Sequence, residues 1–104
     1  MTDKSWKRAE RIIAKRLGGQ RLGPTGRHGA DVTSNLFSIE CKTRKRLPAW
    51  LFGALGQACS GAAGRLPIVI LHQLGQRHDD DLALMRLADL ESWLGAITSQ
   101  EEGA

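Results

Sequence analysis

The sequence predicts an α/β or α+β fold in which a small mixed sheet is flanked by helices. Apolar residues near the N-terminus recur every three to four positions, as in an amphipathic helix. The strand predicted from Leu36 to Lys42 alternates apolar and polar side chains from Phe37 on, which is typical of half-buried strands, and residues 66–72 form the β-branched apolar run of a covered strand. Because 104 residues fit one compact domain, we expect a single domain over 1–104 with a thin core.

The first helix is predicted between a capping residue and a pair of glycines. Asp3 or Ser5 can accept hydrogen bonds from the first helical N–H groups, and Gly18-Gly19 follows the last apolar position at Leu17. A short strand is then expected at 20–22.

The next elements are predicted from turn residues and hydrophobic periodicity. Residues 23–29 are rich in glycine and form a turn-rich loop, and strands at 30–35 and 36–43 follow it. The remaining elements are a basic connector at 43–47, a helix from Pro48 to Ala63, a strand at 66–72, a polar loop at 73–81, a strand at 82–87, a helix at 88–97 and a frayed tail at 98–104. The predicted order is α-β-β-β-α-β-(β)-α.

Positive charge is concentrated in the first half of the chain. Residues 1–50 hold twelve lysines and arginines against four acids, whereas residues 51–104 hold three basic and seven acidic side chains. A basic half of this strength suits a polyanionic partner such as nucleic acid, although a solvated helix face could account for part of it. A small RNA-binding domain is disfavoured, because the chain has no tyrosine and two phenylalanines for base stacking.

Other features limit the location and the redox state of the chain. The longest apolar stretches are too short to span a bilayer, and residues 1–6 lack the apolar segment of a signal peptide. We therefore expect a cytoplasmic protein without a membrane partner. Cys41 and Cys59 do not have metal-type spacing, and we expect both to be reduced, structural thiols.

The segment from Leu36 to Lys42 carries a candidate site. Side chains two positions apart share one face of a strand, so Phe37, Ile39 and Cys41 should face the core while Glu40 and Lys42 share the opposite face. An isolated pair of this kind is more often a solvated ion pair. Asp31 lies nine positions earlier, on the preceding strand, where a short hairpin can bring its carboxylate beside that of Glu40.

Two converging carboxylates repel each other unless a proton or a cation intervenes. Mg²⁺ prefers carboxylate oxygens and keeps its other positions for water and phosphate, so Asp31 and Glu40 are candidate ligands. Lys42 can then orient a water molecule or stabilise charge on a phosphate. Glu10 gives independent support, because it lies at the edge of the apolar stripe of the first helix. A buried carboxylate needs a metal ion or a partner, and Arg21 is the alternative partner.

The ordered set of these residues resembles the PD-(D/E)XK nuclease superfamily. It comprises Gly29-Ala30-Asp31, Ile39-Glu40-Cys41-Lys42, a preceding helix with Glu10 and a following helix with Gln57. Within the superfamily, the chain is similar over residues 6 to 72 to the small Holliday junction resolvases of archaea and phages. Ala30 replaces the proline of the motif, a position that contributes no ligand. The resemblance implies a restriction-endonuclease-like αβββαβ core.

The resemblance also implies residue roles. Asp31, Glu40 and Glu10 would hold Mg²⁺, for which Mn²⁺ is the expected substitute, and Lys42 would be the catalytic lysine. Gln57 resembles a glutamine found near the site in these enzymes, although a solvated helix residue is nearly as good an interpretation. Residues expected to contact DNA flank the motif: Thr25, Arg27, His28, Arg44, Lys45 and Arg46. His72 and His78 are expected to be structural or surface residues.

The predicted function is metal-dependent endonuclease cleavage of branched DNA. A four-way junction is the leading substrate, and a homodimer would place two active sites for paired cuts. One alternative is a nicking or restriction-type nuclease that acts on ordinary duplex DNA. The other is a catalytically silent DNA-binding domain that retains the nuclease fold. Compactness hints at a phage gene.

Overall fold

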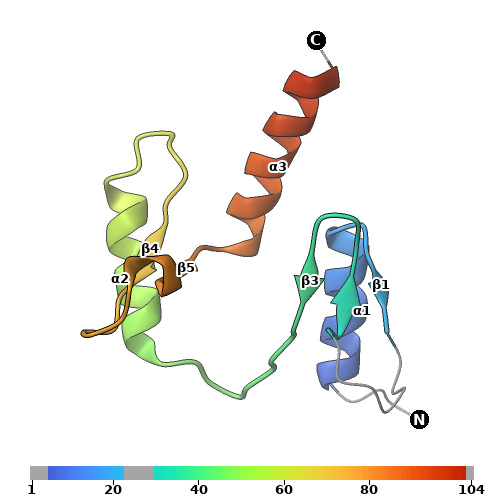
Figure 1. Cartoon of the computed structure of the whole chain (residues 1–104), viewed down its shortest axis with the longest axis horizontal. Helices are drawn as coiled ribbons and strands as arrows, with labels where there is room; N and C mark the ends of the chain where they lie inside the picture. The colour runs from blue at the N-terminus through green and yellow to red at the C-terminus, as the bar shows by residue number, and fades with distance from the viewer. Residues whose placement is uncertain (1–4, 23–29, 103–104) are drawn as a thin grey trace. The chain divides into compact units, whose positions relative to one another are not determined.

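The computed structural model describes residues 5–22 and 30–102 and has an α+β architecture (Figure 1). Its elements follow the predicted order of helices and strands, with one added 3₁₀ turn before the last strand. The chain divides into two compact units, Met1–Arg46 and Leu47–Ala104. The single domain expected from the sequence stays a prediction, and the two units are described separately below.

The first unit combines one helix with a three-stranded antiparallel sheet. Its elements are α1 (Ser5–Arg16), β1 (Gln20–Arg21), β2 (Val32–Thr33) and β3 (Ser38–Ile39). The strand order is β1-β2-β3, and Val32 pairs with Ile39 in the central hairpin. Helix α1 packs against β1 and β2, where Ala14 and Val32 are buried. The small core of this unit therefore lies between α1 and the sheet.

Gly19 permits the close approach of the chain between α1 and β1 to strand β2. A Cβ atom at this position would lie 2.6 Å from the carbonyl oxygen of Thr33 and 3.0 Å from Cγ1 of Val32. The obstructing oxygen belongs to the backbone, so it cannot move aside as a side chain would. A glycine is therefore required where β1 joins the sheet.

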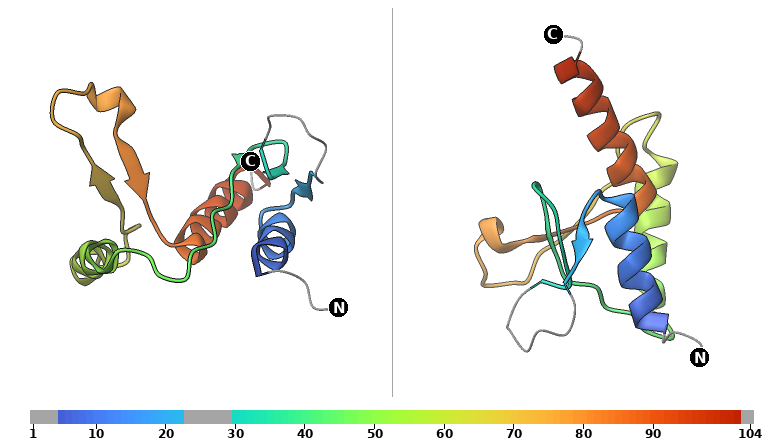
Figure 2. Two further views of the ribbon diagram at one scale, coloured as in Figure 1. Left: turned by 90° about the horizontal axis from the view of Figure 1, so that it is seen from below. Right: turned by 90° about the vertical axis from the view of Figure 1, so that its right-hand side faces the viewer.

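The second unit contains a two-stranded sheet and two helices. Its elements are α2 (Ala49–Ser60), β4 (Val69–Leu71), the 3₁₀ turn η1 (His78–Asp80), β5 (Leu82–Leu84) and α3 (Leu87–Glu102). Strands β4 and β5 are the antiparallel arms of one hairpin, which is closed by a loop that contains η1 (Figure 2). Helix α2 packs against β4, and Leu55 is its buried residue.

The structure shows how the strands pair and changes several predicted element boundaries. Strand β4 pairs with β5, and both sheets of the described residues are antiparallel, so the mixed sheet expected from the sequence stays a prediction. The strands at 32–33 and 38–39 are shorter than predicted. Helix α3 continues to Glu102, through most of the segment expected to fray, because no glycine or proline interrupts residues 96–102. None of the helices in the described part of the chain is long and apolar enough to cross a membrane.

Candidate functional site

The β2–β3 hairpin places Asp31 beside the Glu-Cys-Lys segment. Oδ2 of Asp31 accepts a hydrogen bond from the backbone N–H of Cys41, with an N···O distance of 2.8 Å. The hairpin register pairs Val32 with Ile39 and Thr33 with Ser38, and its continuation by one residue sets Asp31 opposite Glu40. Opposed residues of an antiparallel pair share one face of the sheet. Asp31 and Glu40 are therefore neighbours, as the hairpin predicted.

The alternation predicted for residues 37–42 is present in the structure. Phe37, Ile39 and Cys41 are half-buried, whereas Ser38, Glu40 and Lys42 are exposed. Nζ of Lys42 lies 3.3 Å from Oε1 of Glu40, and both side chains are more than half exposed. An exposed ion pair of this kind contributes little to stability. Both groups therefore remain accessible to a ligand from solvent.

Glu10 is buried on the face of α1 that packs against the sheet. It is 6% exposed, whereas its neighbour Arg11 on the same helix is exposed. Nε of Arg21, on β1, donates to Oε2 of Glu10 at 2.5 Å. The partner that the sequence offered as the alternative to a metal ion is thus present. This ion pair compensates the burial of the carboxylate and ties α1 to β1.

The Cys41 thiol lies near several negatively charged side chains, which affect its pKa. Burial raises the pKa of Cys41, and the negative charges of Asp31, Glu10 and Glu40 raise the pKa further. All three predicted acidic residues therefore act on the Cys41 thiol, two residues after the end of β3. Because they come from α1, from the residue before β2 and from the residue after β3, the fold gathers carboxylates that are far apart in the sequence.

The chemistry of these donors fits a hard divalent cation. Asp31 accepts a hydrogen bond from a backbone N–H group and Glu40 pairs with the exposed Lys42, whereas one oxygen of Glu10 is held by the guanidinium group of Arg21. Within the described residues, however, the group of closely spaced candidate ligands lies elsewhere, at His72, His78 and Asp81. Asp31 and Glu40 are thus the better candidates for direct ligands, and Glu10 would have to exchange Arg21 for the metal.

Comparison of the chain with protein-family models, with curated proteins and with solved structures finds no match. The assignment of function therefore depends on the residues and on their geometry.

The remaining predicted residues fall into three groups. Gln57 is exposed on α2, in the second unit, so its proximity to the carboxylates stays a prediction. Arg44, Lys45 and Arg46 are exposed in the extended segment after β3, where they follow Lys42 along the chain. Thr25, Arg27 and His28 lie outside the described residues.

A second cluster, which was not predicted from the sequence, is formed by His72, His78 and Asp81 around the loop between β4 and β5. The spacing His-x5-His-x2-Asp matches no common metal-binding motif. The cluster could have been predicted from the position of these residues in and beside the loop between two predicted strands. If those strands pair as an antiparallel hairpin, the side chains at the two ends of the loop come together.

Proposed function

We propose that the chain is a metal-dependent DNA endonuclease whose reactive groups are Asp31, Glu40 and Lys42. The observation that carries the proposal is the hydrogen bond from the backbone N–H of Cys41 to Asp31, which sets the carboxylate beside the Glu-x-Lys segment. Glu10 lies on α1, which packs against β1 and β2, and its charge acts on the same thiol as those of Asp31 and Glu40, which supports the comparison with the acid-acid-lysine set of the PD-(D/E)XK nucleases. The finer fold proposal is an αβββαβ core in which β4 extends the first sheet.

Mg²⁺ held by Asp31 and Glu40, with Glu10 as an additional acid, would supply a Lewis acid for phosphodiester hydrolysis. Lys42 is exposed and lies next to Glu40, so its ammonium group can reach a phosphate oxygen or a water molecule at the same surface. A positive group at this position stabilises the negative charge that develops on the phosphate during attack. Glu40, in turn, keeps the ammonium group of Lys42 near the site when DNA is absent.

The charge distribution supports a nucleic-acid substrate. All twelve basic residues of the first half fall within residues 1–46, the same unit that carries the candidate site, together with four acids. Arg44, Lys45 and Arg46 lie two to four positions after Lys42, so phosphates bound by them would lie near the reactive groups. The second unit is acidic and offers no comparable cluster of positive charge.

The substrate we propose is branched DNA, and a four-way junction in particular. A homodimer would present two such sites to one junction and make paired cuts. A nicking or restriction-type nuclease that acts on linear duplex is the first alternative, and a silent DNA-binding domain is the second. Keeping all three reactive groups has no evident purpose in a silent domain, which favours the enzyme.

A cleavage assay separates these alternatives. The protein is incubated with a labelled four-way junction and with a linear duplex of matched sequence, each in Mg²⁺ and in chelator. Paired, Mg²⁺-dependent cuts confined to the junction would support a resolvase. Equal cutting of both substrates would retain the nuclease and discard the junction, whereas tight binding without cutting would favour the silent domain.

A further inference from the structure

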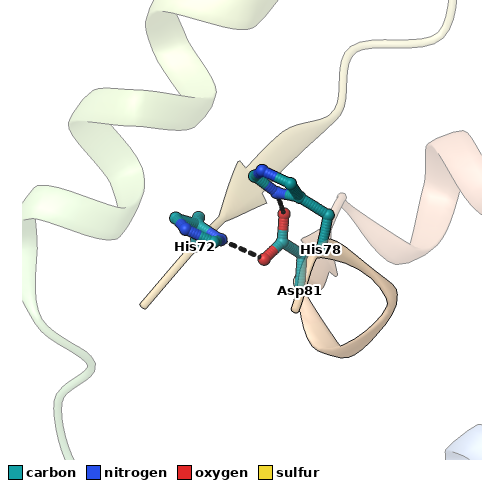
Figure 3. A group of neighbouring side chains, drawn as sticks. All are labelled: His72, His78 and Asp81. Atoms are coloured by element: carbon teal, nitrogen blue, oxygen red, sulfur yellow. Dashed lines mark hydrogen bonds and ion pairs between the residues drawn. The ribbon is translucent and has the colours of Figure 1, made fainter. Parts of the chain in front are cut away.

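The loop between β4 and β5 brings three potential metal ligands into contact. His72 follows the last residue of β4, His78 opens η1, and Asp81 precedes the first residue of β5. Nδ1 of His72 lies 2.6 Å from Oδ1 of Asp81, and Nδ1 of His78 lies 3.0 Å from Oδ2 of the same carboxylate. Figure 3 shows the two rings directed at the two oxygens of Asp81. One carboxylate thus joins both histidines.

The surroundings of the three side chains suit a cation. One donor atom from each residue lies within 4.8 Å of the other two. The carboxylate of Asp81 is largely buried, with 12% of the side chain exposed, whereas 81% of the His78 side chain is exposed and open to an arriving ion. Asp79 and Asp80 add negative charge next to the cluster, and Arg77 pairs with Asp80 and not with Asp81.

The imidazole rings of His72 and His78 are stacked on each other. Their centroids are 4.2 Å apart, with an angle of 28° between the ring planes. This stacked arrangement directs Nδ1 of both rings at the one carboxylate of Asp81, so the three potential donors converge. A ring that binds a metal through Nδ1 carries its proton on Nε2.

We propose that His72, His78 and Asp81 form a binding site for a transition-metal dication of the zinc type, which bridges the two ends of the β4–β5 loop. Two imidazole nitrogens and one carboxylate oxygen form a ligand set that zinc accepts, whereas Mg²⁺ favours oxygen donors alone. Ligands at about 2.0–2.2 Å from a tetrahedral ion lie roughly 3.3 Å from one another. The donor pairs at 2.6 and 3.0 Å would therefore separate by about 0.7 and 0.3 Å, and donor atoms now up to 4.8 Å apart would move closer together.

Three protein ligands leave the fourth tetrahedral position for water or for an external ligand. The site would also link β4 to β5 through the metal, so that occupancy should stabilise the hairpin. All three ligands lie in the second unit, outside the proposed nuclease residues, and this inference does not depend on the nuclease.

Titration of the full-length protein with Zn²⁺ alone, followed by calorimetry, tests the site. We expect one ion to bind per chain, and we expect His78→Ala and Asp81→Asn each to weaken binding by at least about tenfold, since even outer partners of a metal site contribute that much. Asp79→Asn is the matched control, because it removes the same charge beside His78 without removing a ligand, and it should weaken binding much less than Asp81→Asn does. Asp81→Asn is nearly isosteric, and circular dichroism checks that each variant is folded.

The spectrum of bound Co²⁺ distinguishes this site from one built on the cysteines. Ligation by nitrogen and oxygen should give no thiolate charge-transfer band, and Cys41→Ser with Cys59→Ser should leave the titration unchanged. Absence of Zn²⁺ binding, or binding that survives both His78→Ala and Asp81→Asn, would overturn the proposal. The cluster would then be a hydrogen-bonded clamp between the ends of the loop.

Discussion

Asp31 and Cys41 are ten residues apart, and the carboxylate of the first accepts a hydrogen bond from the backbone N–H of the second at 2.8 Å. This contact crosses the β2–β3 hairpin just beyond its last paired residues. It fixes the Asp31 carboxylate beside Glu40 and Lys42, which flank Cys41 in the sequence. The candidate site therefore depends on the register of a very short hairpin.

Replacement of Lys42 by alanine should abolish cleavage while DNA binding is largely kept. The ammonium group acts on charge that develops at the scissile phosphate, whereas the other basic residues of the first unit still bind the backbone. Cleavage and binding are measured separately, by product formation and by equilibrium titration. Lys15→Ala, which removes an exposed lysine from α1, is the charge-matched control. A Lys42→Ala protein that cuts at the wild-type rate would remove Lys42 from the mechanism.

Simultaneous replacement of Arg44, Lys45 and Arg46 by alanine should weaken binding and reduce its salt dependence. Each phosphate contact that is lost should lower the slope of log affinity against log salt by up to about one unit. Binding to the same DNA is titrated at several salt concentrations. Arg77→Ala, in the second unit, should leave the slope unchanged. If the triple variant keeps the wild-type slope, these residues do not contact phosphate.

Replacement of Arg21 should destabilise the first unit through Glu10. The Arg21→Ala variant leaves a buried carboxylate without its partner, which typically costs about 3–5 kcal/mol. Adding Glu10→Gln should recover part of the loss, because the second change removes the unpaired charge. Denaturant unfolding of both single variants and the double variant measures this coupling. Additive effects of the two changes would show that the pair does not interact.

Substitution of Gly19 by alanine should destabilise the packing of β1 against β2. The added Cβ meets the carbonyl oxygen of Thr33 at 2.6 Å, and overpacking of this kind typically costs about 1–3 kcal/mol. Gly53→Ala is the comparison, because nothing lies within 4 Å of its Cβ position in α2 and alanine favours helices by up to about 1 kcal/mol. Equal stability of the two variants would contradict the close approach.

The reactivity of Cys41 should depend on Asp31. Burial and the surrounding carboxylates raise the pKa of the thiol, so less thiolate is present at pH 8 and alkylation should be slow. Asp31→Asn removes one negative charge, which should lower the pKa of Cys41 and speed alkylation at that pH. Mass spectrometry follows Cys41 and Cys59 separately over a range of pH. A pH profile for Cys41 that does not move in Asp31→Asn would place the carboxylate too far away to act.

Much of the first unit could be predicted from the sequence because its signals are local. The periodicity of α1 placed Glu10 at the edge of the apolar stripe. Strict alternation after Phe37 placed Cys41 on one face of the strand and Glu40 and Lys42 on the other. Both follow from the geometry of a single element. The choice between a metal ion and Arg21 as the partner of Glu10 depended on strand pairing, which periodicity does not determine.

The second unit was harder to predict because its features depend on which strands pair. Both strands were expected, but the sequence alone does not tell whether 69–71 pairs with the strand at 82–84 or with the first sheet. The antiparallel pairing with the nearer strand brings His72 and Asp81 together across the loop. Without that pairing, the two histidines looked like ordinary surface residues.

The most direct test of the nuclease proposal is the rate of four-way junction cleavage in Mg²⁺ by the wild type and by Glu40→Ala. The Asp79→Ala variant, which loses a carboxylate of the second unit, is assayed alongside as the control. We expect Mg²⁺-dependent cutting by the wild type and by Asp79→Ala, and no cutting by Glu40→Ala, although the junction is still bound. Cleavage by Glu40→Ala at the wild-type rate would contradict the assignment of the site.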